Sequence, residues 1–183
     1  MDGILITNAT SNQAIIDSGL PLTIENGGRI VTQQFKDCVV NLSGAGATIG
    51  LVICMLFLAK SAQSKQLGKL AIVPACFNIN EPVIFGIPIV LNPIMMIPFV
   101  IVPIVLCVTT YLAMSLGLVP LLQGIEIPWT TPVFISGWIA GGWNALILQI
   151  VNFAVATAIY FPFVKVLDRD LLKNAKKKEL LQE

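Results

Sequence analysis

The chain has 183 residues, of which 56% are hydrophobic and 11% are Asp, Glu, Lys or Arg. A soluble globular chain carries roughly 25% charged residues, so this composition excludes an ordinary soluble enzyme and a disordered tail. The net charge is +1 and there is no histidine, which excludes a basic nucleic-acid-binding surface, a phosphohistidine and a His-ligated metal site. We therefore expect no nucleic-acid partner, no metal and no cofactor.

Long uncharged runs decide the class of protein. Charged residues are absent from three stretches, 38–59, 82–125 and 127–164. Since a membrane-spanning helix needs about 20 mostly apolar residues, the chain is predicted to be an integral membrane protein. The apolar runs are continuous rather than alternating, which favours helices over a β-barrel. The predicted fold class is therefore an all-α integral membrane protein.

The first 36 residues form a polar N-terminal segment, rich in Asn, Thr, Ser and Gly. The segment lacks the basic region and apolar core of a signal peptide. It also contains no membrane span of its own. We therefore expect an N-terminal half to precede it, and we expect the membrane part of this chain to be residues 37–164.

Within that part, three stretches are long enough to cross a membrane as helices, namely Val39 to Ala59, 94–116 and 143–164. Two others, 70–77 and 127–140, are shorter and adjoin prolines and polar residues. Broken backbone at membrane depth is tolerated only where protein or a water-filled cavity satisfies it. We therefore expect about three full spans plus two re-entrant or broken-helix segments, which are typical of a transporter's substrate site.

Lysine and arginine predict the orientation. The short loop 60–69 contains three lysines, and the charged tail 165–183 contains Lys165, Arg169, Lys173, Lys176, Lys177 and Lys178. Because cytoplasmic loops carry an excess of these residues, we expect both the loop and the C-terminus to be cytoplasmic.

Glu81, between Asn80 and Pro82, is the leading candidate for function. A carboxylate flanked by apolar runs is costly in a bilayer and by default marks a functional site that faces a cavity. A carboxylate beside an amide suits sugar hydroxyls, which both donate and accept hydrogen bonds. The alternative is that Glu81 caps a helix or pairs with a lysine such as Lys69.

Two other features have two interpretations each. The small residues of 43–48 (SGAGAT) allow close approach of a ligand or close packing of helices, and composition alone favours packing. Trp129 suits the apolar face of a sugar ring, but it also suits an interfacial aromatic belt. Glu126 is expected to be solvated at a membrane edge.

Residues 77–86 (FNINEPVIFG), followed by 88–93 (PIVLNP), resemble the Asn-Glu-Pro signature of enzyme IIC. This is the membrane component of the bacterial phosphotransferase system, of the lactose/cellobiose/diacetylchitobiose type. Residues 43–48 resemble the family's glycine-rich stretch, with Ser43 and Ala45 in place of a Gly and a Ser. Residues 128–132 (PWTTP) resemble the segment whose Trp stacks on the sugar. The resemblance covers the C-terminal half of the family's chain.

The resemblance implies a permease in the bacterial inner membrane. It would bind a β-linked, cellobiose-like disaccharide and carry it across for phosphorylation by the IIB partner, with IIA upstream. The implied substrate-binding residues are Glu81, Asn80, Asn78, Trp129, Ser43, Gly44 and Gly46. No residue of this chain need carry phosphate, so we expect no catalytic residue. The family's first half would supply the remaining scaffold and the dimer interface, which predicts a homodimer when complete.

Two other functions stay open on the sequence alone. One is an ion-coupled secondary sugar transporter, which would work without phosphotransferase partners. The other is a truncated, non-transporting membrane interaction protein that packs against a full-length relative.

Overall fold

The structure is a computed structural model that describes residues 2–180, and every element in this range is helical. The elements in chain order are α1 (Asp2–Asp17), the π-helix η1 (Phe35–Val40), α2 (Ile49–Phe57), α3 (Ala62–Cys76), α4 (Glu81–Gly86), the 3-10 helix η2 (Ile89–Leu91), α5 (Pro93–Ser115) and α6 (Ile135–Leu180). The all-α prediction is confirmed. The last three residues of the predicted tail, 181–183, lie outside the described residues.

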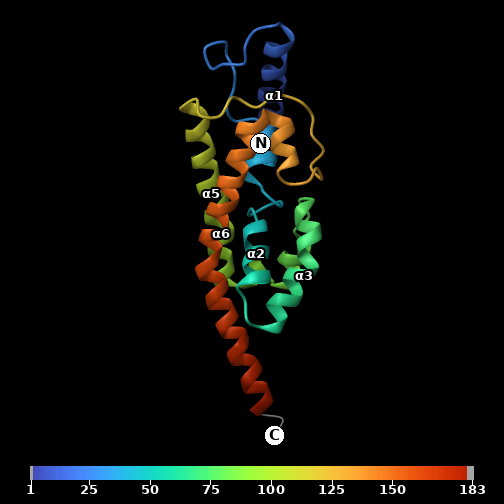
Figure 1. Cartoon of the computed structure of the whole chain (residues 1–183), viewed down its shortest axis with the longest axis vertical. Helices are drawn as coiled ribbons and strands as arrows, with labels where there is room; N and C mark the ends of the chain where they lie inside the picture. The colour runs from blue at the N-terminus through green and yellow to red at the C-terminus, as the bar shows by residue number, and fades with distance from the viewer. Residues whose placement is uncertain (1, 181–183) are drawn as a thin grey trace.

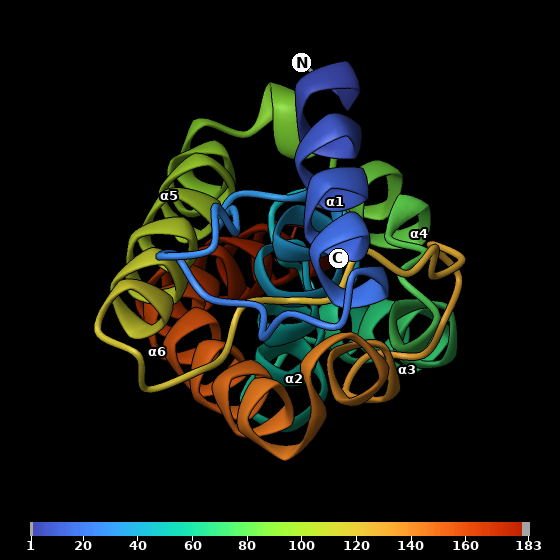
Figure 2. The same cartoon turned by 90° about the horizontal axis from the view of Figure 1, so that it is seen from above.

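The molecule is elongated, with α1 at one end and the C-terminal part of α6 at the other (Figure 1). Viewed from above, α1 lies over the bundle, and α5 and α3 lie on opposite sides of α2 (Figure 2). The core is formed where α2 packs against α3 and α6, and where α5 packs against α6. Residues of the irregular segments that connect the helices are also part of this core.

Two of the described helices, α5 and α6, are long and apolar enough to cross a membrane. Helix α5 begins where the sequence predicts, because Asn92 accepts hydrogen bonds from the N–H groups of Ile94 and Met95 and Pro93 occupies the first helical position. Helix α6 contains the predicted span 143–164. It continues without a second break to Leu180, so the charged tail is helical over its described part.

The segment Val39 to Ala59 is not one straight span, so that prediction is wrong. The chain leaves η1 at Val40, turns through 41–48 and becomes helical again at Ile49. Four residues in the turn have positive φ, with 69° at Ser43, 79° at Gly44, 84° at Gly46 and 49° at Ala47. A right-handed helix cannot contain such angles. Hydropathy misses this break because Gly and Ala read as apolar.

Two buried amides of α6 satisfy the backbone at this break. The Gln149 amide donates to the Cys38 carbonyl, and Asn152 Nδ2 donates to the Val39 carbonyl at 3.1 Å. Asn152 also joins α5, since its Nδ2 donates to Thr110 Oγ1 at 2.8 Å. An unsatisfied carbonyl at membrane depth costs several kcal/mol, so these side chains make the broken backbone possible.

The two shorter apolar stretches form parts of hairpins. Stretch 70–77 is the second half of α3, a 15-residue helix that runs back beside α2. The predicted loop 60–69 is therefore mostly helix, because Ser61 caps α3 by accepting from the Ser64 N–H. The stretch 127–140 ends in a short helical arm that breaks at Gly141 and Gly142 before the rest of α6. The predicted discontinuity is confirmed there.

Asp168 ties the tip of the α2–α3 hairpin to α6. The N–H groups of Lys60 and Ser61 donate to its two carboxylate oxygens at 2.7 and 2.9 Å. The Asp168 side chain is buried in this contact. As a result, the hairpin tip and the basic C-terminal part of α6 lie at the same end of the molecule (Figure 1).

We predict that Asp168→Asn destabilises the fold by about 2 kcal/mol, because the carboxylate accepts from two N–H groups, whereas the amide oxygen accepts from one of them without the charge and its NH2 group faces the other. The measurement is the midpoint of thermal unfolding in detergent. Asp170→Asn is the matched control, because Asp170 is half exposed and its ion pair with Lys173 is long, at 4.0 Å. Equal midpoints for the two variants would contradict the prediction.

Candidate functional site

Asn78 joins three segments that are distant in the sequence. Its Oδ1 accepts from the Ser43 N–H at 2.9 Å, and its Nδ2 donates to the carbonyls of Trp129 and Thr131 at 2.9 and 3.0 Å. Asn78 itself has a φ of 61°, which turns the chain sharply between α3 and α4. The structure therefore brings three predicted site residues together, namely Ser43, Asn78 and Trp129.

Asn80 also contacts the glycine-rich turn. Its Nδ2 donates to the Ala45 carbonyl at 2.7 Å. A Cβ atom added at Gly44 would lie 3.0 Å from both the Asn78 carbonyl oxygen and the Asn80 amide. A side chain at this position would crowd both groups, and the φ of 79° favours glycine as well. Gly44 thus lets the turn pack closely against the Asn-Glu-Pro segment.

Gly46 lies deeper in the fold. A Cβ atom at this position would overlap the Phe99 ring, and the Gly46 carbonyl accepts from the Tyr160 hydroxyl at 2.6 Å. The Ser43 hydroxyl oxygen is buried and has no hydrogen-bond partner among the described residues. In this structure the turn is therefore held by hydrogen bonds to its backbone and by close packing against the protein.

Glu81 is exposed at the first position of α4. Within residues 2–180 its carboxylate makes no hydrogen bond and no ion pair, so the alternative pairing with Lys69 is not found. Asn80, not Glu81, is the residue that precedes the helix. The backbone of Glu81 is therefore placed by α4, and its exposed carboxylate has no partner within residues 2–180.

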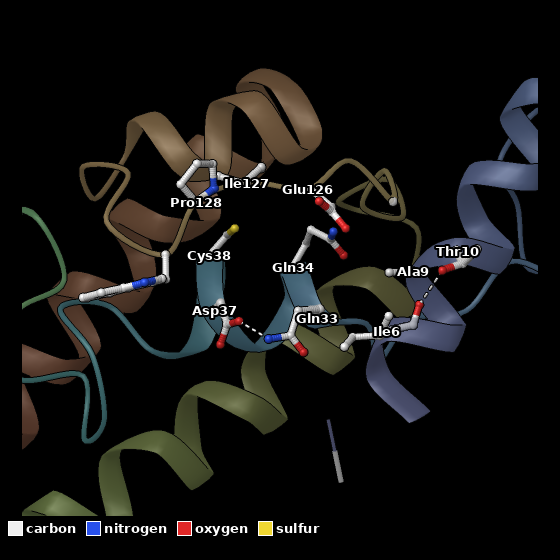
Figure 3. Close-up of a pocket in the computed structure, with 12 residues that line it drawn as sticks. Ile6, Ala9, Thr10, Gln33, Gln34, Asp37, Cys38, Glu126, Ile127 and Pro128 are labelled. Carbon is white, nitrogen blue, oxygen red and sulfur yellow. Dashed lines mark hydrogen bonds between the residues drawn. The ribbon is translucent and has the colours of Figure 1, made fainter. Parts of the chain in front are cut away.

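Trp129 has a fixed backbone and an open side chain. Its carbonyl is held by Asn78, whereas the residue as a whole is 63% exposed. Its side chain helps to line a cavity of about 480 Å³. The other lining residues come from α1, from η1 and the two residues before it, and from the loop before α6; they are Ile6, Ala9, Thr10, Gln33, Gln34, Asp37, Cys38, Gly124, Glu126, Ile127 and Pro128 (Figure 3).

The polar lining of this cavity was missed by the sequence analysis. Glu126 is exposed as expected, but it faces the cavity instead of lying alone at a membrane edge. Gln34 Nε2 donates to the Ile125 carbonyl at 2.6 Å, a contact across 91 residues of sequence. The sequence does contain a signal for this polar lining, because two adjacent glutamines and Asp37 stand just before an apolar run.

A salt bridge lies next to this cavity. Lys36 Nζ lies 2.8 Å from Asp2 Oδ1 and 3.5 Å from Asp37 Oδ1. The hydrogen bond to Asp2 raises the pKa of Lys36 above its usual value, with burial acting in the opposite direction. The same bond lowers the pKa of Asp2. Lys36 thus stays protonated and is shared between two carboxylates, of which Asp2 is the nearer.

The model of the family described as "Phosphotransferase system, EIIC" matches residues 1–103. The lichenan permease IIC component of Bacillus subtilis (strain 168) is 49% identical over 156 residues, which are 84% of this chain and 34% of that protein. The cellobiose-specific EIIC component of Geobacillus stearothermophilus is 52% identical over 142 residues, which are 76% of this chain and 32% of that protein. The chain therefore spans about a third of the length of these relatives.

A solved structure shows the same fold. It is the crystal structure of the transporter ChbC, the IIC component from the N,N′-diacetylchitobiose-specific phosphotransferase system. The TM-score is 0.90 at 42% identity, and the match covers 96% of this chain and 40% of that one. Since the family model matches more than half of the residues as well, the chain belongs to the EIIC family of the phosphotransferase system.

Proposed function

We propose that this chain is the sugar-binding part of a phosphotransferase-system permease. It binds a cellobiose-like, β-linked disaccharide and moves it across the membrane for phosphorylation by a IIB partner, which receives its phosphate from IIA. The observation that carries the proposal is the Glu81 carboxylate, which has no partner within the described residues. Glu81 follows shortly after Asn78 in the sequence, and Asn78 holds the Trp129 carbonyl. The names of the relatives, which specify lichenan, cellobiose and N,N′-diacetylchitobiose, support the sugar class.

The site residues have separate roles in this proposal. Glu81 accepts hydrogen bonds from sugar hydroxyls, and the Trp129 indole stacks on the apolar face of a ring. Asn80 offers its remaining oxygen, and backbone around Ser43, Gly44 and Gly46 lines the site. Asn78 acts as a positioning residue, because its amide oxygen and nitrogen already hold three backbone groups.

We also propose how the chain lies in the membrane. Helices α5 and α6 cross it fully, and Val39 to Ala59 forms a third, broken crossing that consists of the end of η1, the turn 41–48 and α2. Helix α3 is too short to cross, since 15 residues fall below the about 20 needed, and it returns as a re-entrant arm. The helical arm before Gly141 is the second re-entrant piece.

The remaining proposals concern location and partners. The chain lies in the bacterial cytoplasmic membrane with its C-terminus and the α2–α3 tip in the cytoplasm, where IIB and IIA act. Residues 1–36 lie on the outer side or against an N-terminal half of EIIC. That half completes the permease, which is a homodimer. The two alternative functions are an ion-coupled transporter and a non-transporting interaction protein. The experiments below distinguish them from the proposed permease.

The function is tested in a swap protein, in which residues 1–183 replace the matching segment of the cellobiose-specific EIIC component of Geobacillus stearothermophilus. We predict that the swap protein takes up radiolabelled cellobiose in cells that contain IIA and IIB, and that the 183-residue chain alone does not. Uptake that needs an ion gradient but no IIB would show an ion-coupled transporter. A swap protein that neither binds nor takes up cellobiose would support the interaction protein instead.

In the swap protein, Glu81→Gln is predicted to lower cellobiose affinity by roughly ten- to a hundredfold, because it weakens charge-assisted hydrogen bonds. Equilibrium binding of radiolabelled cellobiose in membranes measures the change. Glu25→Gln is the control, because Glu25 is exposed in the loop after α1 and lies away from the site. Unchanged affinity in Glu81→Gln would remove this residue from the sugar site.

Asn78→Ala is predicted to behave differently, because it leaves three backbone groups without partners. It should lower the free energy of unfolding by about 2–3 kcal/mol and weaken sugar binding together. Thermal unfolding in detergent, measured beside binding, separates this result from Glu81→Gln, which should keep its midpoint. Asn174→Ala, at an exposed position on α6, is the control. Weaker binding at an unchanged midpoint would make Asn78 a direct sugar ligand.

The orientation is tested with a membrane-impermeant thiol reagent on intact cells. Gln66→Cys, at an exposed position on α3, should react only after the cells are opened. Glu25→Cys, in the loop after α1 at the opposite end of the molecule, is the comparison. It should react in intact cells if residues 1–36 lie on the outer side. Labelling of Gln66→Cys in intact cells, above the level of the unsubstituted protein, would overturn the proposed orientation.

A further inference from the structure

One face of α6 is exposed and apolar over the length of a membrane. The residues of this face follow one another at spacings of three or four, which place them on the same side of a helix. They are Ile147, Val151, Ala154, Ala158 and Pro162, and all of them are exposed. Other sides of α6 pack against α2 and α5. We call the exposed face the outer stripe of α6.

The outer stripe becomes basic where its apolar part ends. Lys165, Arg169, Lys173 and Lys176 continue the same spacing, and each of them is exposed. Asp168 lies on the inner side of α6, where its buried carboxylate holds the α2–α3 hairpin tip. Figure 1 shows that the C-terminal part of α6 extends past this hairpin. The outer stripe therefore joins an apolar part to a row of cations on one side of the helix.

The length of α6 places two of these cations at the level of lipid headgroups. Residues 143–164 carry no charge, and at 1.5 Å per residue this part of the helix is about 33 Å long. The hydrocarbon core of a bilayer is about 30 Å thick, and each headgroup layer adds about 5–7 Å. Lys165 and Arg169 are about 6 Å apart along the axis, so together they span one headgroup layer. Lys173 and Lys176 lie beyond it.

Lys165 and Arg169 have no ion-pair partner within residues 2–180, whereas Lys173 lies 4.0 Å from Asp170. The Lys165 ammonium lies 4.1 Å from the centre of the Phe161 ring, which is one turn nearer the membrane. This cation–π contact keeps the ammonium on the membrane side. The guanidinium of Arg169 has the planar shape that binds two oxygens of a phosphate. The two side chains thus offer positive charge and N–H donors to an anion from outside the chain.

A phospholipid with an anionic headgroup matches both parts of the outer stripe. Its acyl chains would lie against Ala158 and Pro162, and its phosphate would lie beside Lys165 and Arg169. Basic residues next to the cytoplasmic end of a spanning helix attract anionic lipids. A soluble acidic protein or a free phosphate ion would gain nothing from the apolar part. The continuity of the two parts therefore favours a lipid.

We propose that the outer stripe of α6 binds an anionic phospholipid of the cytoplasmic leaflet, with Lys165 and Arg169 holding its phosphate. The proposal goes beyond sugar transport, and it rests only on the proposed crossing and orientation of α6. Phosphatidylglycerol is anionic, whereas phosphatidylcholine is neutral because its choline group offsets the phosphate. The site therefore selects between these lipids by the net charge of the headgroup.

The test measures lipid preference next to the outer stripe. The swap protein receives the reporter Ala158→Trp, which places an indole about 9 Å below the level of Val164, where acyl chains pass. It is reconstituted in phosphatidylcholine vesicles that contain an equal fraction of either brominated phosphatidylglycerol or brominated phosphatidylcholine. The measured quantity is the quenching of the fluorescence that the reporter adds. We expect a roughly tenfold preference for phosphatidylglycerol, which high salt should reduce.

In the reporter protein, Lys165→Gln combined with Arg169→Gln is expected to remove this preference. Each substitution alone should lower it about threefold. The matched control combines Lys69→Gln with Arg29→Gln, which changes the charge equally at two exposed positions outside the outer stripe. The control should keep the preference. Equal quenching by the two brominated lipids before these substitutions, or an unchanged preference after the first pair, would overturn the proposal.

A second pair of substitutions tests the level of the site. Lys173→Gln combined with Lys176→Gln should keep most of the preference, because these residues lie beyond the headgroup layer. The pair removes as much charge as Lys165→Gln with Arg169→Gln. An equal loss in both pairs would mean that the charge of the whole tail attracts lipid, and the proposed site would be overturned.

Further measurements on the same vesicles separate the lipid from other partners. Inorganic phosphate at constant ionic strength should leave the preference unchanged, and its loss would assign the cations to free phosphate instead. If Lys165→Gln with Arg169→Gln loses binding to purified IIB but keeps the lipid preference, the surface serves a protein and the proposal is overturned. Cellobiose binding is measured in parallel. A lipid preference without cellobiose binding would support this proposal while the proposed function fails.

Discussion

The fold depends on amide and carboxylate side chains that satisfy backbone groups where helices break. A helix that stops inside a bilayer exposes carbonyl and N–H groups that water cannot reach. Asn152 and Gln149 satisfy the end of η1, and Asn78 and Asn80 hold the turn 43–48 against the start of α4. Asp168 satisfies the hairpin tip. Without these contacts the end of η1, the turn 43–48 and the hairpin tip would leave backbone groups without partners.

The polar residues fall into two sets, according to whether backbone groups occupy their side-chain atoms. Side chains whose atoms are taken up by backbone partners set positions, as Asn78 does for the Trp129 carbonyl. Side chains that keep exposed oxygens without a partner are available to a ligand, as Glu81 and Glu126 are in the described structure. Both sets look alike in the sequence, because each consists of polar residues next to apolar runs. Only the contacts separate them.

The sequence could predict features that depend on local composition. The apolar run 94–116 predicted α5, and the short, proline-containing stretch 127–140 predicted the discontinuity that the structure places at Gly141 and Gly142. The break at 41–48 was missed because it depends on φ angles that small residues permit but do not require. The cavity was missed for another reason: Gln34 meets Ile125 across 91 positions. No local pattern encodes such a contact, whereas the Asn-Glu-Pro motif was visible because its residues are adjacent.

Charge is distributed unevenly along the molecule, and the proposed function gives this distribution a role. Asp37 and Glu126 line the cavity near α1, while the α2–α3 hairpin tip and the basic part of α6 lie toward the opposite end (Figure 1). A disaccharide is neutral on entry and anionic after phosphorylation. The carboxylates of Asp37 and Glu126 would therefore repel the sugar after the reaction but not before it. Under the proposed orientation, the basic end faces the compartment that receives the anion, so electrostatics would oppose return of the product.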